Sequence, residues 1–177
     1  MVDGRAGIML LAETRESVEL LRDCCAVPGV SRIHIGLNDL SLDLGKRFMF
    51  ELLVDGTVER MARDIRASGT PFGIGGVARV DEGLVPAQEI LVQHARLGSD
   101  AAILSRTFHR NAPSVTAIES EMDFACEVEK LRRAYHRALA MSDAERALQI
   151  EVMQTKIAAI AARMPDRAAT ASSTAFP

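Results

Sequence analysis

The feature that most constrains the fold is a repeated pattern in which a short apolar run is followed by a longer stretch of helical character. We predict strands at residues 7–12, 32–36, 72–75 and 101–104. Helical sequence follows the first three, with predicted helices at residues 14–26, 46–54, 58–68 and 86–97. A polar loop is predicted between residues 36 and 45, after the second strand. Neighbouring parallel strands need a crossover connection, which is usually a helix. The pattern therefore predicts an α/β fold with a parallel sheet.

Polar and glycine residues cluster where these predicted strands end. In α/β folds, ligands bind at the carboxyl ends of parallel strands. We therefore expect the candidate site to draw on the residues at these ends, which are Glu13, the segment 36–39, Gly73, Gly75, Gly76, Ser105 and Arg106.

The composition narrows the class of protein. With 177 residues, of which 48% are apolar, the chain is long enough to bury one core. A net charge of −3 argues against a nucleic-acid partner, which would favour a basic excess. The three cysteines form no zinc-binding or disulfide pattern, and the N-terminal apolar run is too short for a signal peptide or a membrane span. We therefore expect a cytoplasmic protein that does not associate with membranes.

The region after residue 110 has a different pattern. Apolar residues recur at helical spacing on both sides of the sequence MSDAE, where Ser142 is a predicted helix cap. The two stripes are Phe124, Val128, Leu131, Tyr135 and Ala138, and then Met153, Ile157, Ile160 and Met164. These predicted helices would serve packing or self-association, so a homo-oligomer is expected. The predicted division is a region at 1–110, a helical region at 111–164 and a disordered tail at 165–177.

The acids Glu13 and Asp39 are candidate metal ligands. Carboxylates at neighbouring strand ends can share a hard divalent cation such as Mg²⁺ or Mn²⁺. On spacing alone, a second interpretation is favoured: Asp39 could cap a turn and Glu13 could interact with a helix dipole. Gly36 and Asn38 could likewise expose backbone N–H groups to a carboxylate, or could simply form a turn.

Other candidate motifs give weaker signals. The sequence FGIGG lacks the spacing of a dinucleotide-binding motif, and no GxSxG nucleophile motif is present. His34 is expected inside a strand, and His94 and His136 on helices, in packing or surface positions. His109 follows the last predicted strand and is the one histidine that we place near a possible site. Cys24 and Cys25 lie in a predicted helix, where core positions are commoner than reactive ones.

The stretch LLAETRESVELLRDCCAVPGVSRIHIGLNDLSLDLG, residues 10–45, resembles the HpcH/HpaI aldolase and citrate lyase family. In that family an acid–threonine pair opens a helix and a GxxDLSxxLG loop follows the next strand. The separation of 26 residues between Glu13 and Asp39 agrees with that of the family's two metal-binding acids. Together with the later segment RLGSDAAILSRTF, the resemblance extends over residues 7–108.

The resemblance implies a (β/α)8 TIM barrel, of which this chain would contain about the last four βα units. It further implies that Glu13 and Asp39 bind Mg²⁺ or Mn²⁺, and that Gly36, Asn38 and Asp39 bind the substrate. The implied activity is that of a carbon–carbon lyase, which would cleave a 2-oxo acid or an acyl-CoA substrate through a metal-stabilised pyruvate enolate.

The sequence also departs from the family's pattern. A glutamine two residues before the metal-binding glutamate is Leu11 here, and a proline after the loop glycine is Leu37. The family's substrate-binding arginine and its proton-transfer histidine and acid belong to the first half of the barrel, so the catalytic residues are unassigned. We expect activity only when a complete barrel forms. The alternative is an inactive remnant or a self-associating interaction protein.

Overall fold

The sheet confirms the predicted α/β class. The computed structural model describes residues 5–165, so nearly all of the predicted disordered tail lies outside the described residues. Four strands, β1 (Ile8–Ala12), β2 (Val30–Ile35), β3 (Phe72–Val77) and β4 (Ala101–Leu104), pair in parallel in the order β1-β2-β3-β4. The carboxyl ends of all four strands therefore meet at one edge of the sheet.

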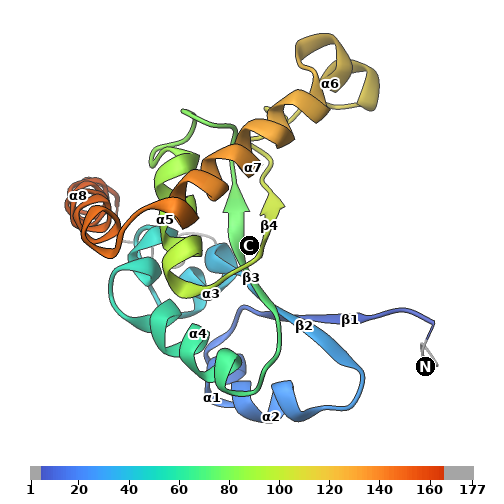
Figure 1. Ribbon diagram of the computed structural model, residues 1–177, viewed down its shortest axis with the longest axis vertical. Helices are drawn as coiled ribbons and strands as arrows, with labels where there is room; N and C mark the ends of the chain where they lie inside the picture. Colours follow the sequence, from blue (N-terminus) through green and yellow to red (C-terminus); the bar gives the residue numbers. More distant parts are fainter. Residues whose placement is uncertain (1–4, 166–177) are drawn as a thin grey trace, which may run out of the picture.

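Helical segments connect and follow the strands (Figure 1). After β1 come α1 (Arg15–Glu19) and α2 (Leu21–Ala26). After β2 come α3 (Leu37–Asp43), the 3-10 helix η1 (Met49–Leu53) and α4 (Thr57–Ala67), and α5 (Ala87–Leu97) joins β3 to β4. The C-terminal part consists of α6 (Val115–Glu121), α7 (Phe124–Ala140) and α8 (Asp143–Ala161).

The main correction concerns residues 36–45, which we predicted as a polar loop. Residues 37–43 form α3, because Leu37 and Leu40 lie one turn apart and both are buried against the sheet. The predicted helix 14–26 is divided at Leu20, and the predicted helix 46–54 is a 3-10 turn at its C-terminal end. The helix α6, which begins at the capping residue Ser114, was not predicted.

The two faces of the sheet differ in what covers them. Ile33, Ile35 and Ile74 are almost fully buried in the core that the strands share with the helices. On the opposite face, Met9, Leu11 and Ile103 are each close to half exposed, at 48%, 49% and 46%. Figure 1 shows α4 and α5 together on one side of the strands. The opposite face is therefore uncovered at the edge strands β1 and β4.

Glycines on β3 allow its neighbours to approach closely. A Cβ atom on Gly73 would stand 2.5 Å from Nδ1 of His34 and 2.9 Å from the carbonyl oxygen of Ala101. His34, paired with Gly73 in the strand register, is buried as expected, and its Nε2 lies 3.1 Å from the carbonyl oxygen of Gly75. The imidazole of β2 thus occupies space that a side chain of β3 would need.

The C-terminal helices use the predicted stripes. α7 packs on α5, and α8 packs on α5 and η1. Leu131 and Met153 are buried in the common core, and the Tyr135 hydroxyl donates to the carbonyl oxygen of Ser99 at 2.9 Å. The predicted cap is confirmed, since the Ser142 hydroxyl accepts from the backbone N–H of Glu145. Within residues 5–165, no helix has both the length and the apolar character needed to cross a membrane.

Candidate functional site

Glu13 and Gly36 meet where β1 and β2 end. The backbone N–H of Gly36 donates to the carbonyl oxygen of Ala12 at 3.0 Å, which extends the strand pairing up to the edge. A Cβ atom on Gly36 would stand 2.9 Å from both Cβ and Oε2 of Glu13. The Glu13 carboxylate therefore lies against the backbone of Gly36. Since φ of Gly36 is −83°, glycine is required here by this close approach and not by backbone conformation.

Asn38 and Asp39 lie in the first turn of α3, immediately after Gly36. Both side chains are exposed, and Nδ2 of Asn38 donates to Oδ1 of Asp39 at 3.2 Å. Gly36 is the N-cap, so no side chain caps this end of the helix. The first backbone N–H groups of a helix have no partner within the helix and carry the positive end of its dipole. Asp39 is thus placed at a helix start, next to the residue that contacts Glu13.

A second contact holds the segment after β1 beside α3. The backbone N–H of Arg15 donates to Oδ2 of Asp43, near the C-terminal end of α3. Thr14 and Ser17 form a reciprocal capping box that begins α1, with hydrogen bonds of 3.1 Å and 3.0 Å. Glu13 is therefore placed by the end of β1 on one side and by a capped, tethered helix start on the other.

The chemistry of the Glu13 and Asp39 side chains fits a hard divalent cation. Both offer carboxylate oxygens, the ligands that Mg²⁺ and Mn²⁺ prefer. Glu13 is half-buried and Asp39 is exposed, so water or a ligand can reach them. Residues 5–165 contain no group of three or more His, Cys, Asp or Glu side chains arranged to hold a metal. Two protein carboxylates with the remaining positions left to water and ligand oxygens suit magnesium, which keeps several waters in protein sites.

The other half of the same edge carries buried polar groups that sequence analysis only partly identified. Ser105 follows β4 directly, and its hydroxyl is buried without a hydrogen-bond partner among the described residues. Nδ1 of His109 is also buried and unpartnered within residues 5–165. His109 lies beyond β4, two strands away from β2, so the structure places it at the same edge but on different elements from Asp39.

Arg79, two residues beyond β3, was not among the candidates. Its side chain is 9% exposed, and its Nε lies 3.4 Å from Oε2 of Glu82. Both Nε and one terminal nitrogen, Nη2, lack a hydrogen-bond acceptor among the described residues. A buried arginine with unused donors is uncommon, because a buried polar group without a hydrogen-bond partner is costly. The sequence did offer one indication: Arg79 lies shortly after the predicted strand at residues 72–75, where functional residues are expected.

Two buried histidines lie on β2 and α5. Burial lowers the pKa of His94 to about 4, and the nearby His34 lowers it further in the same direction. Burial also lowers the pKa of His34, although its hydrogen bond to the Gly75 carbonyl opposes the shift. Nδ1 of His94 lies 3.0 Å from the Ser99 hydroxyl. Both rings are therefore neutral at physiological pH. His136 is exposed on α7, and Cys24 and Cys25 are half-buried free thiols on α2.

Comparison with known proteins assigns no relative. No family model, no curated protein and no solved structure matches the chain.

Proposed function

We propose that this chain provides the metal-binding part of a carbon–carbon lyase that acts on a 2-oxo acid or an acyl-CoA substrate. In this proposal Glu13 and Asp39 bind Mg²⁺ or Mn²⁺, and the start of α3 at Gly36 and Asn38 binds the substrate carboxylate. The observation that carries the proposal is the contact between the Glu13 carboxylate and Gly36, which lies three residues before Asp39 at the shared edge of β1 and β2.

Each residue has a distinct role in the proposed site. Glu13 and Asp39 hold the cation from two neighbouring elements, so neither carboxylate alone would fix its position. The uncapped N-terminus of α3 offers backbone N–H groups that suit an anionic carboxylate. When bound, a divalent cation supplies electrostatic stabilisation of negative charge that develops on the oxo oxygen during bond cleavage. Gly36 lets the Glu13 carboxylate approach the start of α3.

The uncovered sheet face bears on when such a site would be active. The exposed side chains of Met9, Leu11 and Ile103 lie on the face that would form the interior of a closed barrel. β1 and β4 are the edge strands of the sheet and have unpaired outer edges within the described residues. We propose that further strands close these edges into a complete (β/α)8 barrel, and that activity depends on that closure.

Calorimetric titration with Mg²⁺ and with Mn²⁺, in the presence and absence of oxalate as a mimic of the substrate, tests the metal site. We expect a single site whose affinity increases when oxalate is present, because oxalate oxygens would fill ligand positions left open by the protein. In the Glu13→Gln, Asp39→Asn double variant, binding should weaken by about 100-fold or more, as two charged ligands are replaced.

A matched control has the same net charge as this double variant. The Glu19→Gln, Asp23→Asn variant removes one glutamate and one aspartate that are exposed on α1 and α2. Its metal affinity should stay within about twofold of the parent, since long-range charge effects are screened by salt. If the parent protein binds neither ion, or if both double variants weaken binding equally, the proposed metal site is wrong.

The second candidate function is self-association without catalysis. It is favoured by the exposed apolar face and by Val115 and Phe124, which are 70% and 44% exposed around α6. Exposed apolar residues of this kind often mark protein–protein contacts. Sedimentation at micromolar concentration distinguishes the two: a monomer that binds metal supports the lyase proposal, and a dimer without metal binding supports self-association.

A further inference from the structure

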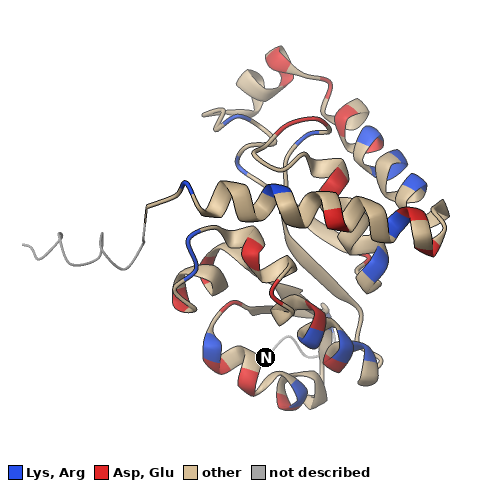
Figure 2. Cartoon of the chain, turned by 90° about the vertical axis from the view of Figure 1, so that its left-hand side faces the viewer, with Lys and Arg blue, Asp and Glu red and all other residues tan. Residues whose placement is uncertain are grey.

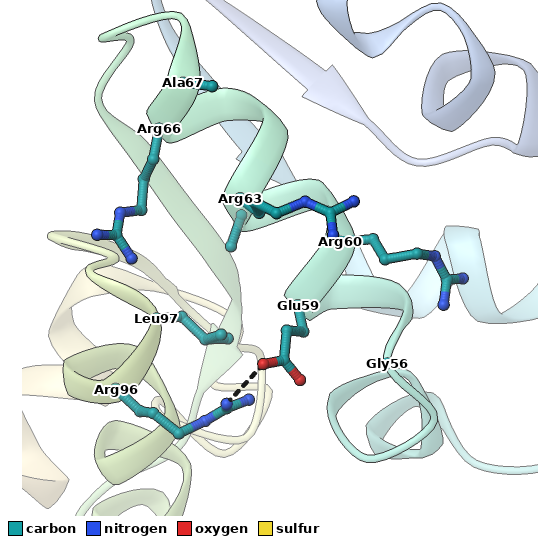
Figure 3. Close-up of a pocket in the computed structure, with 9 residues that line it drawn as sticks. Gly56, Glu59, Arg60, Arg63, Arg66, Ala67, Arg96 and Leu97 are labelled. Atoms are coloured by element: carbon teal, nitrogen blue, oxygen red, sulfur yellow. Dashed lines mark hydrogen bonds and ion pairs between the residues drawn. The ribbon is translucent and has the colours of Figure 1, made fainter. Parts of the chain in front are cut away.

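A hollow lies between α4 and α5, away from the carboxyl ends of the strands. Its volume is about 710 Å³, and its charged lining consists of Arg60, Arg63 and Arg66 from α4, Arg96 from α5, and Glu59. Figure 3 shows Arg66 and Arg96 on the side of Leu97, whereas the side chains of Arg60 and Arg63, nearer the start of α4, extend to the other side. Four arginines and one glutamate thus line one hollow, in a chain whose net charge is −3.

Most of these arginines have weak partners or none. Arg96 pairs with Glu59 at 3.0 Å, and Arg66 makes no side-chain hydrogen bond or ion pair with any described residue. Nε of Arg63 lies 3.5 Å from Oδ1 of Asp64 and its side chain is 71% exposed. That same oxygen is 3.0 Å from Arg22, so Asp64 is shared between two cations.

The helix α7, which carries four Lys and Arg residues and two Glu residues, contains two short ion pairs. Figure 2 shows acidic and basic residues next to each other along α7. There, Lys130 pairs with Glu127 at 2.6 Å and Arg133 pairs with Glu129 at 3.2 Å. On α4 the arginines at 60, 63 and 66 are instead spaced three residues apart, where like charges repel one another.

The helix dipole accounts for only part of this arrangement. Arg66 and Arg96 lie in the last turns of α4 and α5, where a positive charge is favourable. Arg60 lies near the start of α4, where the dipole disfavours a cation. Among the described residues its side chain donates a hydrogen bond only to the Thr57 hydroxyl, at 3.3 Å, and forms no ion pair.

We propose that this arginine groove, lined by Arg60, Arg63, Arg66 and Arg96, binds a small organic polyphosphate such as a nucleoside triphosphate. Guanidinium groups bind phosphate oxygens in a bidentate manner and also stack on planar bases. Because the guanidinium groups come from two helices, a ligand with several phosphates can contact more of them than orthophosphate can. Glu59 would compete with the ligand for Arg96.

The groove is separate from the proposed metal site. Its lining comes entirely from α4, the glycine that precedes it, and the C-terminal end of α5. α5 leads into β4, so that end lies at the amino end of the strands, opposite Glu13 and Asp39. Polyphosphate bound here would therefore not take part in the proposed cleavage. It would act at a distance from the metal site, as a regulatory ligand.

The test is calorimetric titration of the full chain, without divalent metal, with tripolyphosphate, ATP and orthophosphate at one fixed ionic strength. Tripolyphosphate and ATP should bind at one site, at least about tenfold more tightly than orthophosphate. The Arg66→Gln, Arg96→Gln variant should weaken ATP binding by about tenfold or more. Glu59→Gln should instead strengthen it, because it removes the competing carboxylate.

The control removes two arginines from elsewhere. The Arg133→Gln, Arg137→Gln variant of α7 should leave ATP affinity within about twofold, since both side chains lie outside the groove. Equal weakening in both double variants would show non-specific attraction of anions and overturn the proposal, as would the absence of ATP binding to the parent. Binding of oligonucleotides more tightly than ATP would also overturn it. Loss of metal binding leaves all these outcomes unchanged, so the two proposals fail separately.

Discussion

Acidification should destabilise this protein well above the pH range in which carboxylates titrate, because His94 is buried in its neutral form. Its pKa is about 4 in the folded chain and 6.5 for an ordinary histidine. Between these values the unfolded state binds more protons, so stability is complete above about pH 6.5 and falls as the pH decreases towards 4. For one such group, lowering the pH from about 7.5 to about 5 lowers the free energy of unfolding by about 2 kcal/mol.

Burial also lowers the pKa of His34, and this adds a contribution of the same sign. The assay is urea-induced unfolding at both pH values, for the parent and for His94→Gln. The variant should be less stable at the higher pH but should lose markedly less stability on acidification. His136→Gln, which changes an exposed histidine of α7, should behave like the parent. If His94→Gln loses as much stability as the parent between the two pH values, buried neutral His94 is not the cause of the acid sensitivity.

Three further substitutions test the site and the packing. Gly36→Ala places a Cβ 2.9 Å from the Glu13 side chain, so it should weaken Mg²⁺ binding in calorimetry. The control is Gly45→Ala, whose Cβ meets no atom within 4 Å; it should only reduce the free energy of unfolding, by about 1 kcal/mol. Asp39→Ala should abolish metal binding and change the unfolding free energy by less than about 1 kcal/mol, because the side chain is exposed. If circular dichroism showed this variant to be unfolded without metal, Asp39 would serve the fold and not the metal. Met153→Ala should lower the free energy of unfolding in urea by about 3 kcal/mol, since Met153 is 1% exposed. Val152→Ala, on the exposed face of α8, should lower it by about 0.5 kcal/mol or less. Equal losses would show that α8 is not packed as described.

The parallel sheet could be predicted because its strands have strong local signals. Each is a short apolar run between turn residues, and the helices between them have capping residues or apolar spacing. The ends were less predictable: β3 continues past Gly75 to Val77, although Gly75 has a φ of +45°. There the pairing with β4 is irregular, which follows from contacts between strands and not from local sequence.

The helix α3 could have been predicted from its leucine spacing, but the polar residues among the leucines favoured a loop. Leu37, Leu40 and Leu44 have helical spacing, but the polar pair Asn38 and Asp39 favoured a loop prediction. The structure places Glu13 against Gly36, where β1 and β2 end. Arg79 was missed because its burial depends on elements distant in sequence. The metal, the substrate and the closure of the barrel stay predictions.

The close fit between β2 and β3 implies that two positions cannot vary independently. His34 occupies the space over Gly73, so an alanine at 73 would collide with the imidazole, and a small residue at 34 would leave a void. Substituting both at once should therefore cost less than the sum of the two single changes. Within this sheet, the histidine and the glycine form an epistatic pair, and any lineage that changed one would be under pressure to change the other.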